Sequence, residues 1–310
     1  MSAPRVHLIS GATGLVGSRL AAALIAEGLV VRALTRNLRE ASARLDPRAL
    51  LVRWDGTQIP VDAVNGTDAI VHLAGEPIFA GPLTARRRRA IHASRVESTR
   101  SLVRAISALP EPSRPQVLVC ASAVGYYGSR GDEELAEKAP SGEGFLAQVC
   151  RDWEAAALQA EDLGVRCVSL RIGVVIAREG GALPRLALPF RYGLGGRLGS
   201  GRQWFPWIHV EDLVELVRSV LRDNDYRGAV NAVAPEPVRN RDLTRVVAAQ
   251  LGRPNLLPAP AFALRAVLGE LADELLGSRR VIPQRALAGG FEFRHHSIES
   301  AIEAELGVDQ

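Results

Sequence analysis

The chain has 310 residues, of which 47% are hydrophobic and 23% are charged, and its formal net charge at pH 7 is +4. This composition is that of a globular protein with enough apolar material for a sizeable core. The small positive excess suits an anionic small ligand, but it is too weak and too dispersed to indicate a nucleic-acid-binding protein.

Two features predict a cytoplasmic protein. No stretch of 18 or more apolar residues is present, so no membrane-spanning helix is expected. Residues 1–5 lead directly into a strand pattern, which leaves no room for a signal or transit peptide. The spacing of Cys120, Cys150 and Cys167 fits neither a zinc site nor a disulfide framework, so three reduced, buried thiols are expected.

Short apolar segments alternate with longer amphipathic segments along the first 171 residues. The apolar segments predict strands at residues 6–10, 29–35, 50–53, 69–73, 116–121 and 166–171. The amphipathic segments predict helices, notably at residues 15–26, 84–109 and 145–163. This alternation predicts an α/β fold with a doubly wound parallel sheet of the Rossmann type.

The residue composition of the sequence and its pattern of apolar segments change after Arg171. Residues 178–205 are rich in Gly, Pro and Leu, and residues 207–222 return to a strand-then-helix pattern. Residues 232–310 predict two or three helices broken by prolines. We therefore predict a Rossmann domain formed by residues 1–173 and 206–232, and a smaller, discontinuous C-terminal α/β domain formed by residues 174–205 and 233–310.

A glycine-rich loop follows the first predicted strand and opens the first predicted helix. It runs Gly11, Ala12, Thr13, Gly14, Leu15, Val16 and Gly17. Glycines here let the chain turn tightly and let a phosphate approach the N–H groups of a helix N-terminus. The strand before the loop and the helix after it favour a dinucleotide-binding loop over a turn with a purely structural role.

The end of the second predicted strand indicates which dinucleotide is bound. A site that prefers NAD usually has Asp or Glu here, which accepts a hydrogen bond from the ribose 2′-hydroxyl. This chain has Arg36 instead, and a guanidinium forms charge-assisted hydrogen bonds with a 2′-phosphate. The sequence therefore predicts NADP(H) as the cofactor, and the alternative is a solvated arginine at a strand end.

Further short motifs are distributed along nearly the whole chain. They are His72-Leu-Ala-Gly75, Trp153-Glu154-Ala-Ala-Ala157, Gly199-Ser-Gly201, Phe205-Pro-Trp-Ile-His209 and Val281-Ile-Pro-Gln-Arg285. Together with the Gly-x-x-Gly-x-x-Gly loop, they resemble the extended short-chain dehydrogenase/reductase superfamily, and within it the NAD(P)-binding "epimerase family" subgroup with a C-terminal extension. The resemblance implies that Thr35 and Arg36 flank the adenosine 2′-phosphate.

The resemblance implies cofactor contacts beyond these positions. Leu73, Ala74 and Gly75 would line the ribose side of the cofactor. Arg95 stands where relatives carry a polar residue that supports the cofactor, and Val174 would approach the nicotinamide. The alternatives are a plain core role for Leu73 and Val174, and a surface ion pair for Arg95.

The usual catalytic pair of the superfamily is absent. Its reductases and epimerases use Tyr-x-x-x-Lys, in which the lysine lowers the pKa of the tyrosine. The only lysine here is Lys138, and by resemblance the tyrosine region falls near Phe145, with Val149 where lysine is expected. We predict instead that Ser122 and Tyr127 are catalytic, the alternatives being a hydrogen bond within a loop and packing.

Other conspicuous residues predict no further site. The run Arg86–Arg89 lacks interleaved aromatic residues, so a solvated helix face is favoured over a nucleic-acid contact. No cluster of ligands accompanies His295 and His296 in the sequence, so no metal is expected. The glycine-rich segment 193–201 is a candidate mobile lid over an anionic substrate, because arginines flank it.

These features leave two main functions open. The first is an NADP(H)-binding oxidoreductase or epimerase-like enzyme that acts on a small polar or anionic substrate with a non-standard acid/base. The second is a non-catalytic NADP(H)-binding regulator, since similar proteins of cyanobacteria and plastids are linked to cell division. A nucleic-acid-binding protein is a remote third. No membrane partner is expected, and the sequence does not indicate an oligomeric state.

Overall fold

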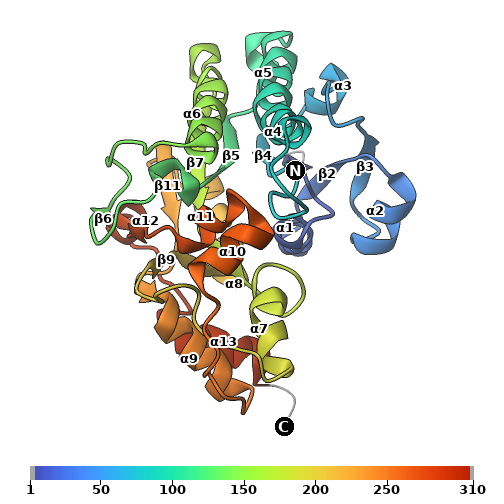
Figure 1. Ribbon diagram of the computed structural model, residues 1–310. Coiled ribbons are helices and arrows are strands. Elements are labelled where there is room, and N and C mark those ends of the chain that lie inside the picture. Colours follow the sequence, from blue (N-terminus) through green and yellow to red (C-terminus); the bar gives the residue numbers. More distant parts are fainter. Residues whose placement is uncertain (1–3, 308–310) are drawn as a thin grey trace.

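A seven-stranded parallel sheet forms the centre of the molecule in a computed structural model, which describes residues 4–307 (Figure 1). The strands are β1 (Val6–Ser10), β2 (Val30–Thr35), β3 (Leu50–Arg53), β4 (Ala69–His72), β5 (Val117–Ala123), β7 (Arg166–Ile172) and β11 (Gly228–Ala232). Their order is β11-β7-β5-β4-β1-β2-β3, so the chain winds outward from β1 in both directions. This is the doubly wound arrangement, and the predicted fold class is confirmed.

Helices cover both faces of the sheet. On one face lie α1 (Leu15–Ala26) and α8 (Val210–Arg222), and on the other lie α3 (Val61–Val64), α5 (Ser98–Ser107) and α6 (Phe145–Leu158). Neighbouring strand residues point to opposite faces, so Val119 joins the first core cluster and Leu118 the second. Burial on both faces explains why the strands are continuously apolar rather than alternating. α2 (Leu38–Arg44) adds Ala41 to the first core cluster, and α4 (Ala85–His92) packs against α6 through Ile91.

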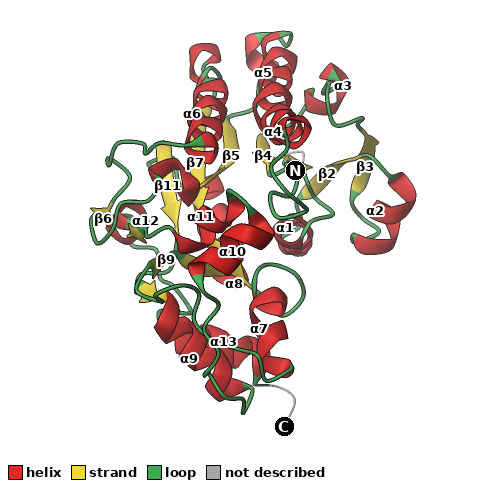
Figure 2. Cartoon of the chain, viewed as in Figure 1, coloured by secondary structure: helices red, strands yellow, loops and turns green. Residues whose placement is uncertain are grey.

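The C-terminal part is mostly helical, as Figure 2 shows. Its helices are α7 (Leu183–Arg191), α9 (Asn240–Gln250), α10 (Ala261–Leu268), α11 (Leu271–Leu276), α12 (Gln284–Ala288) and α13 (Ile298–Leu306). Three two-stranded pairs accompany them: β8 (Val174–Ile176) with β10 (Trp207–His209), β9 (Trp204–Phe205) with β12 (Val238–Arg239), and β6 (Glu134–Leu135) with β13 (Arg280–Val281). A separate apolar cluster around Trp207 and Phe190 holds α7, α9 and α13 together.

The predicted domain division needs one correction. Residues 284–293 were expected in the C-terminal domain, but Ala286, Phe291 and Phe293 are buried in the core cluster of the large sheet. The apolar side chains of this segment cover β11, which would otherwise expose an apolar face at the end of the sheet. Residues 1–3 and 308–310, which end the two predicted domains, lie outside the described residues.

Three further expectations concern the cysteines, membrane-spanning helices and the helix over residues 84–109. The three cysteines are free and buried, as predicted. Within residues 4–307, the helices are all too short or too polar to cross a membrane. The predicted long helix over 84–109 is interrupted, because the π-helical turn Ala93–Glu97 separates α4 from α5.

Candidate functional site

The glycine-rich loop joins the carboxyl end of β1 to the N-terminus of α1, and its packing depends on missing side chains. Gly11 has a φ of +72°, and a Cβ there would lie 3.0 Å from the amide nitrogen of Ala74. A Cβ on Gly17 would lie 2.3 Å from the carbonyl oxygen of Gly11. Glycine at both positions therefore lets the loop pack against the end of β4 and lets α1 start directly under the loop.

The N-terminus of α1 carries an unneutralised positive partial charge. Gly14 is its exposed N-cap, no side chain caps the helix, and the first turn contains no acidic residue. The surrounding Thr13, Leu15 and Val16 are half-buried. Free N–H groups at a helix N-terminus form an anion site, so this loop fits the pyrophosphate of a dinucleotide.

Arg36 is exposed at the carboxyl end of β2 and makes no hydrogen bond or ion pair with any residue in 4–307. Its guanidinium is therefore available to a ligand at the adenosine end of the loop. The preceding Thr35 is buried, and its hydroxyl accepts a hydrogen bond from the Asn37 N–H at 3.2 Å. The Thr35 hydroxyl closes the turn after β2, so the predicted contact of this side chain with the phosphate finds no support.

The segment after β4 is fixed by a buried histidine. His72 Nδ1 lies 2.7 Å from Ser10 Oγ, and its Nε2 lies 3.1 Å from Ser98 Oγ. Complete burial lowers the pKa of His72 to about 4, so the ring is neutral at pH 7. These hydrogen bonds hold the half-buried Leu73 and Ala74 beside the glycine loop. Leu73 also packs against both core clusters, in line with the core role weighed as its alternative.

Arg95 lies on the π-helical turn Ala93–Glu97 and contacts the segment that follows β4. Its Nη1 donates to the carbonyl oxygen of Glu76 at 3.0 Å, and its guanidinium carbon would lie 3.1 Å from a Cβ on Gly75. Its guanidinium also faces the Trp153 ring at 5.3 Å, and burial lowers its pKa. Arg95 makes no ion pair with a described carboxylate, so the alternative of a surface ion pair is wrong.

Val174 begins β8, where it is half-buried and pairs with Trp207. The segment 177–182 then turns back toward the glycine loop. A Cβ on Gly181 would lie 3.4 Å from Leu15 Cδ2, so this turn packs against the start of α1. Val174 therefore lies on a strand that leads to the predicted cofactor loop, while its own side chain packs against the C-terminal apolar cluster, in line with the core role weighed for it.

Ser122 lies near the carboxyl end of β5 and donates a hydrogen bond to Glu154 Oε1 at 2.6 Å. Glu154 comes from α6 and binds Arg171 of β7 through both carboxylate oxygens, at 2.9 and 2.8 Å. Burial opposes the charge of Arg171, but the hydrogen bonds and the charge of Glu154 outweigh it and raise the pKa of the guanidinium. Ser122, Glu154 and Arg171 thus form a connected polar network near the carboxyl ends of β5 and β7.

Tyr127 belongs to the interior rather than to this edge. Its side chain is fully buried, its hydroxyl donates to Asn231 Oδ1 at 2.6 Å, and it accepts from Arg171 Nη1 at 2.9 Å. Burial, which Arg171 only partly offsets, raises the pKa of Tyr127 to about 12. The raised pKa opposes release of the hydroxyl proton, and the hydroxyl is bonded to Asn231 and Arg171 in the interior, so these contacts favour the packing alternative over the predicted catalytic role.

Glu154 and Arg171 are the site residues that the sequence analysis missed. The signal was present, because an arginine inside the apolar run 166–172 must find an opposite charge when the strand is buried. The glutamate that pairs with this arginine is Glu154 on α6. Its neighbours in the helix, Trp153 and Ala157, are core residues. A search for unmatched charges in predicted core segments would have paired the two.

Three other expectations change with the structure. The segment 193–201 is not a free lid, because Leu198 pairs with Ala259 and its N–H donates to Asn240 Oδ1 at 2.8 Å. In the arginine run, Arg88 binds Glu270, so this face is not purely solvated. His295, expected to lack partners, lies against other candidate metal ligands.

Comparison with known proteins agrees with this geometry. Residues 7–232 match the model of the NAD dependent epimerase/dehydratase family, and residues 259–305 match a domain of unknown function, DUF1731. The chain belongs to the NAD dependent epimerase/dehydratase family. The resemblance predicted from the sequence and the nucleotide-binding fold are therefore confirmed.

Relatives in this family cover nearly the whole chain. The Arabidopsis thaliana protein "Epimerase family protein SDR39U1 homolog, chloroplastic" is 40% identical over 300 residues, which are 96% of this chain and 85% of the relative. The human epimerase family protein SDR39U1 is 36% identical over 303 residues, 96% of this chain and 98% of the relative. Since one relative is chloroplastic, the cytoplasmic location of this chain stays a prediction.

Solved structures extend the likeness to three dimensions. Human SDR39U1 (isoform 2), solved with NADPH, matches with a TM-score of 0.86 and 34% identity, covering 98% of this chain and 99% of that one. A Corynebacterium glutamicum protein described as a nucleoside-diphosphate sugar epimerase matches with a TM-score of 0.80 and 36% identity, covering 99% of this chain and 59% of that one.

Proposed function

We propose that this chain binds NADP(H) and acts as an oxidoreductase or epimerase-like enzyme on a small polar or anionic substrate. The observation that carries the cofactor assignment is the unpaired guanidinium of Arg36 beside the uncapped N-terminus of α1. Together they offer one positive group to a 2′-phosphate and another to a pyrophosphate. The NADPH bound to the human relative supports the same cofactor here.

Ser122 and Glu154 would take the place of the missing tyrosine and lysine. Bound NADP(H) supplies hydride exchange with a substrate carbon. In the oxidation direction, the proton of a substrate hydroxyl passes to Ser122 Oγ while the serine proton passes to Glu154 Oε1, 2.6 Å away. In the reverse direction the same two transfers return the proton to the substrate oxygen. Arg171 holds the glutamate oxygens in place and balances their charge.

The cofactor assignment can be tested with Arg36→Asp. We expect this variant to lose about tenfold or more of its affinity for NADPH, because a charge-assisted contact becomes a repulsion. Its affinity for NADH should change little, since NADH lacks the 2′-phosphate. Calorimetric titration of both cofactors measures this, with exposed Arg39→Asp as the matched control. Equal losses for the two cofactors would overturn the assignment of NADP(H).

The catalytic assignment needs a turnover assay. NADPH absorbance is followed after a panel of small polar carbonyl compounds is added to the full chain. For a compound that is reduced, Ser122→Ala should lower the rate about 100-fold or more while leaving NADPH affinity unchanged. A variant that keeps the full rate would exclude Ser122 as the proton donor.

A non-catalytic NADP(H)-binding regulator is the second candidate function. It is favoured by the saturation of the polar network, since Ser122 is only 3% exposed and its hydroxyl is already bonded to Glu154. Under this proposal the protein would bind NADPH tightly and consume none with any member of the panel. Tight binding without turnover would therefore replace the first proposal with the second.

A further inference from the structure

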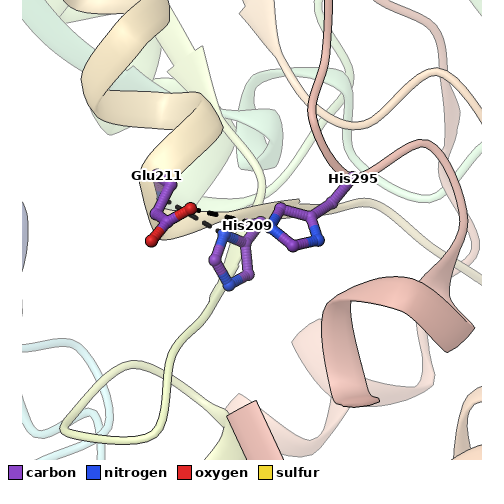
Figure 3. A group of neighbouring side chains, drawn as sticks. All are labelled: His209, Glu211 and His295. Atoms are coloured by element: carbon purple, nitrogen blue, oxygen red, sulfur yellow. Dashed lines mark hydrogen bonds and ion pairs between the residues drawn. The ribbon is translucent and has the colours of Figure 1, made fainter. Parts of the chain in front are cut away.

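Three side chains with metal-binding atoms meet where the C-terminal segment crosses the start of α8. His209 ends β10, Glu211 lies in the first turn of α8, and His295 comes from the segment before α13. One ligand atom from each residue lies within 4.8 Å of the other two (Figure 3). His295 is more than 80 positions away from the other two residues in the sequence, so only the fold brings it to them.

His295 is the least satisfied member of this cluster. Its side chain is 8% exposed, and neither ring nitrogen has a hydrogen-bond partner within residues 4–307. Its backbone is held rigidly, because Asp212 accepts from the N–H groups of Arg294 at 2.7 Å and His295 at 3.0 Å. Buried polar atoms are almost always paired, so a buried imidazole held in place without a partner points to a ligand.

His209 is already oriented as a metal ligand would be. Its Nε2 lies 2.8 Å from Glu305 Oε1, and a carboxylate only accepts hydrogen bonds, so the proton is on Nε2. The lone pair is then on Nδ1, which accepts only a long hydrogen bond of 3.3 Å from the Glu211 N–H. A histidine that donates to a carboxylate through one nitrogen and offers the other is the usual arrangement at metal sites.

The spacing between the other two ligands also suits an ion. His295 Nε2 and Glu211 Oε2 lie 3.7 Å apart, which is too far for a hydrogen bond. Two tetrahedral ligands at zinc distances of about 2.0–2.1 Å lie about 3.3 Å apart. Movement of a few tenths of an ångström would therefore bring these two atoms onto one ion.

The charges around the cluster favour a cation. Glu211, Asp212 and Glu305 supply three carboxylates, which outweigh the positive end of α8. One competing charge is Arg294, whose Nη1 donates to Glu211 Oε2 at 2.9 Å. Its side chain is 73% exposed, and exposed ion pairs contribute little stability, so Arg294 can turn away when an ion binds.

We propose that His209 Nδ1, Glu211 and His295 Nε2 form a binding site for a first-row divalent transition metal of the zinc type, with Glu305 as the outer partner of His209. Two imidazoles and one carboxylate are ligands that Zn²⁺ and Co²⁺ accept, and the fourth position is left to water. Such an ion would join the C-terminal segment to the start of α8.

The site can be tested with Co²⁺ on the full chain, prepared without a histidine tag. The wild-type protein should bind one equivalent, with visible absorption bands that Zn²⁺ abolishes. His295→Phe keeps a ring stacked on His209 but removes the ligand, and it should weaken Co²⁺ binding at least tenfold. His296→Phe is the matched control, because this neighbouring histidine is exposed and outside the cluster, and it should bind as the wild type does.

Further variants separate folding from metal binding. Glu305→Gln should weaken Co²⁺ binding about tenfold to 100-fold through the orientation of His209. Zn²⁺ should raise the melting temperature of the wild type and of His296→Phe but not that of His295→Phe. A wild-type protein without saturable Co²⁺ absorption, or a folded His295→Phe with unchanged affinity, would overturn the proposal.

Discussion

Arg171 binds Glu154 through two parallel hydrogen bonds, from Nε to Oε1 at 2.9 Å and from Nη2 to Oε2 at 2.8 Å. The Arg171 side chain is 5% exposed and that of Glu154 is 15% exposed. Because the two charges are paired, each offsets the desolvation free energy of the other. The guanidinium also stacks on the Tyr126 ring at 3.5 Å and donates to Tyr127. This pair therefore organises the whole edge of the sheet between β5, β7 and α6.

Breaking this pair should destabilise the protein strongly. Arg171→Met leaves the Glu154 carboxylate buried without a counter-charge, and we expect a loss of about 3 kcal/mol in the free energy of unfolding. Glu154→Gln should cost a similar amount. The double variant should cost clearly less than the sum, because no unpaired charge is left, and urea unfolding of all four proteins measures this coupling. Additive losses would contradict a direct interaction.

Tyr127→Phe separates a structural role from a catalytic one. Removal of the hydroxyl leaves Asn231 Oδ1 and Arg171 Nη1 each without one partner, so a loss of about 1–3 kcal/mol is expected. NADPH affinity and any turnover found in the carbonyl panel should be unchanged at temperatures where the variant is folded. A variant of full stability without turnover would restore the catalytic interpretation of this tyrosine.

His72 should make the stability of the protein depend on pH. Its pKa is about 4 in the folded state, below the ordinary value of 6.5 expected for the unfolded chain. The unfolded state therefore binds more protons between these two values, and stability is lost as the pH falls from 6.5 toward 4. For this one histidine the loss is on the order of 3 kcal/mol. Urea unfolding at several pH values should show a smaller pH dependence for His72→Asn than for the wild type; an identical dependence would contradict the assignment.

Gly17 and Gly14 should respond differently to the same added methyl group. Gly17→Ala places a Cβ 2.3 Å from the Gly11 carbonyl oxygen, so α1 must move, and we expect a loss of about 3 kcal/mol. At Gly14 the nearest atom would be 3.2 Å away and the φ of −78° suits alanine. Gly14→Ala should stay within about 1 kcal/mol of the wild type but lose about tenfold in NADPH affinity, because its Cβ stands where phosphate approaches. Thermal unfolding and calorimetry distinguish these outcomes.

The sequence predicted the sheet well because local signals determine its strands. The strands after Arg5, Gly28 and Ala49 begin within one residue of their predicted positions, since each is a short apolar run bounded by turn residues. The glycine loop could be predicted equally well, because Gly11 and Gly17 are required by contacts with each other and with the end of β4.

What the sequence could not reveal are pairings between distant segments. Nothing near Ser122 in the sequence indicates that Glu154 accepts its hydrogen bond, and nothing near His295 indicates that it lies against His209. The return of residues 284–293 to the large core was missed for the same reason, because Phe291 and Phe293 have the pattern of any buried segment. Burial alone does not say which core a residue joins.

The turn at residues 177–182 links three remote parts of the chain. It packs on Leu15 of the glycine loop through Gly181, and the Arg178 amide donates to Glu305 in the last helix. A nascent chain can form the glycine loop early, but this support is complete only when α13 has left the ribosome. A chain that ends before α13 would therefore keep this turn but lack the Glu305 carboxylate that holds it beside the glycine loop.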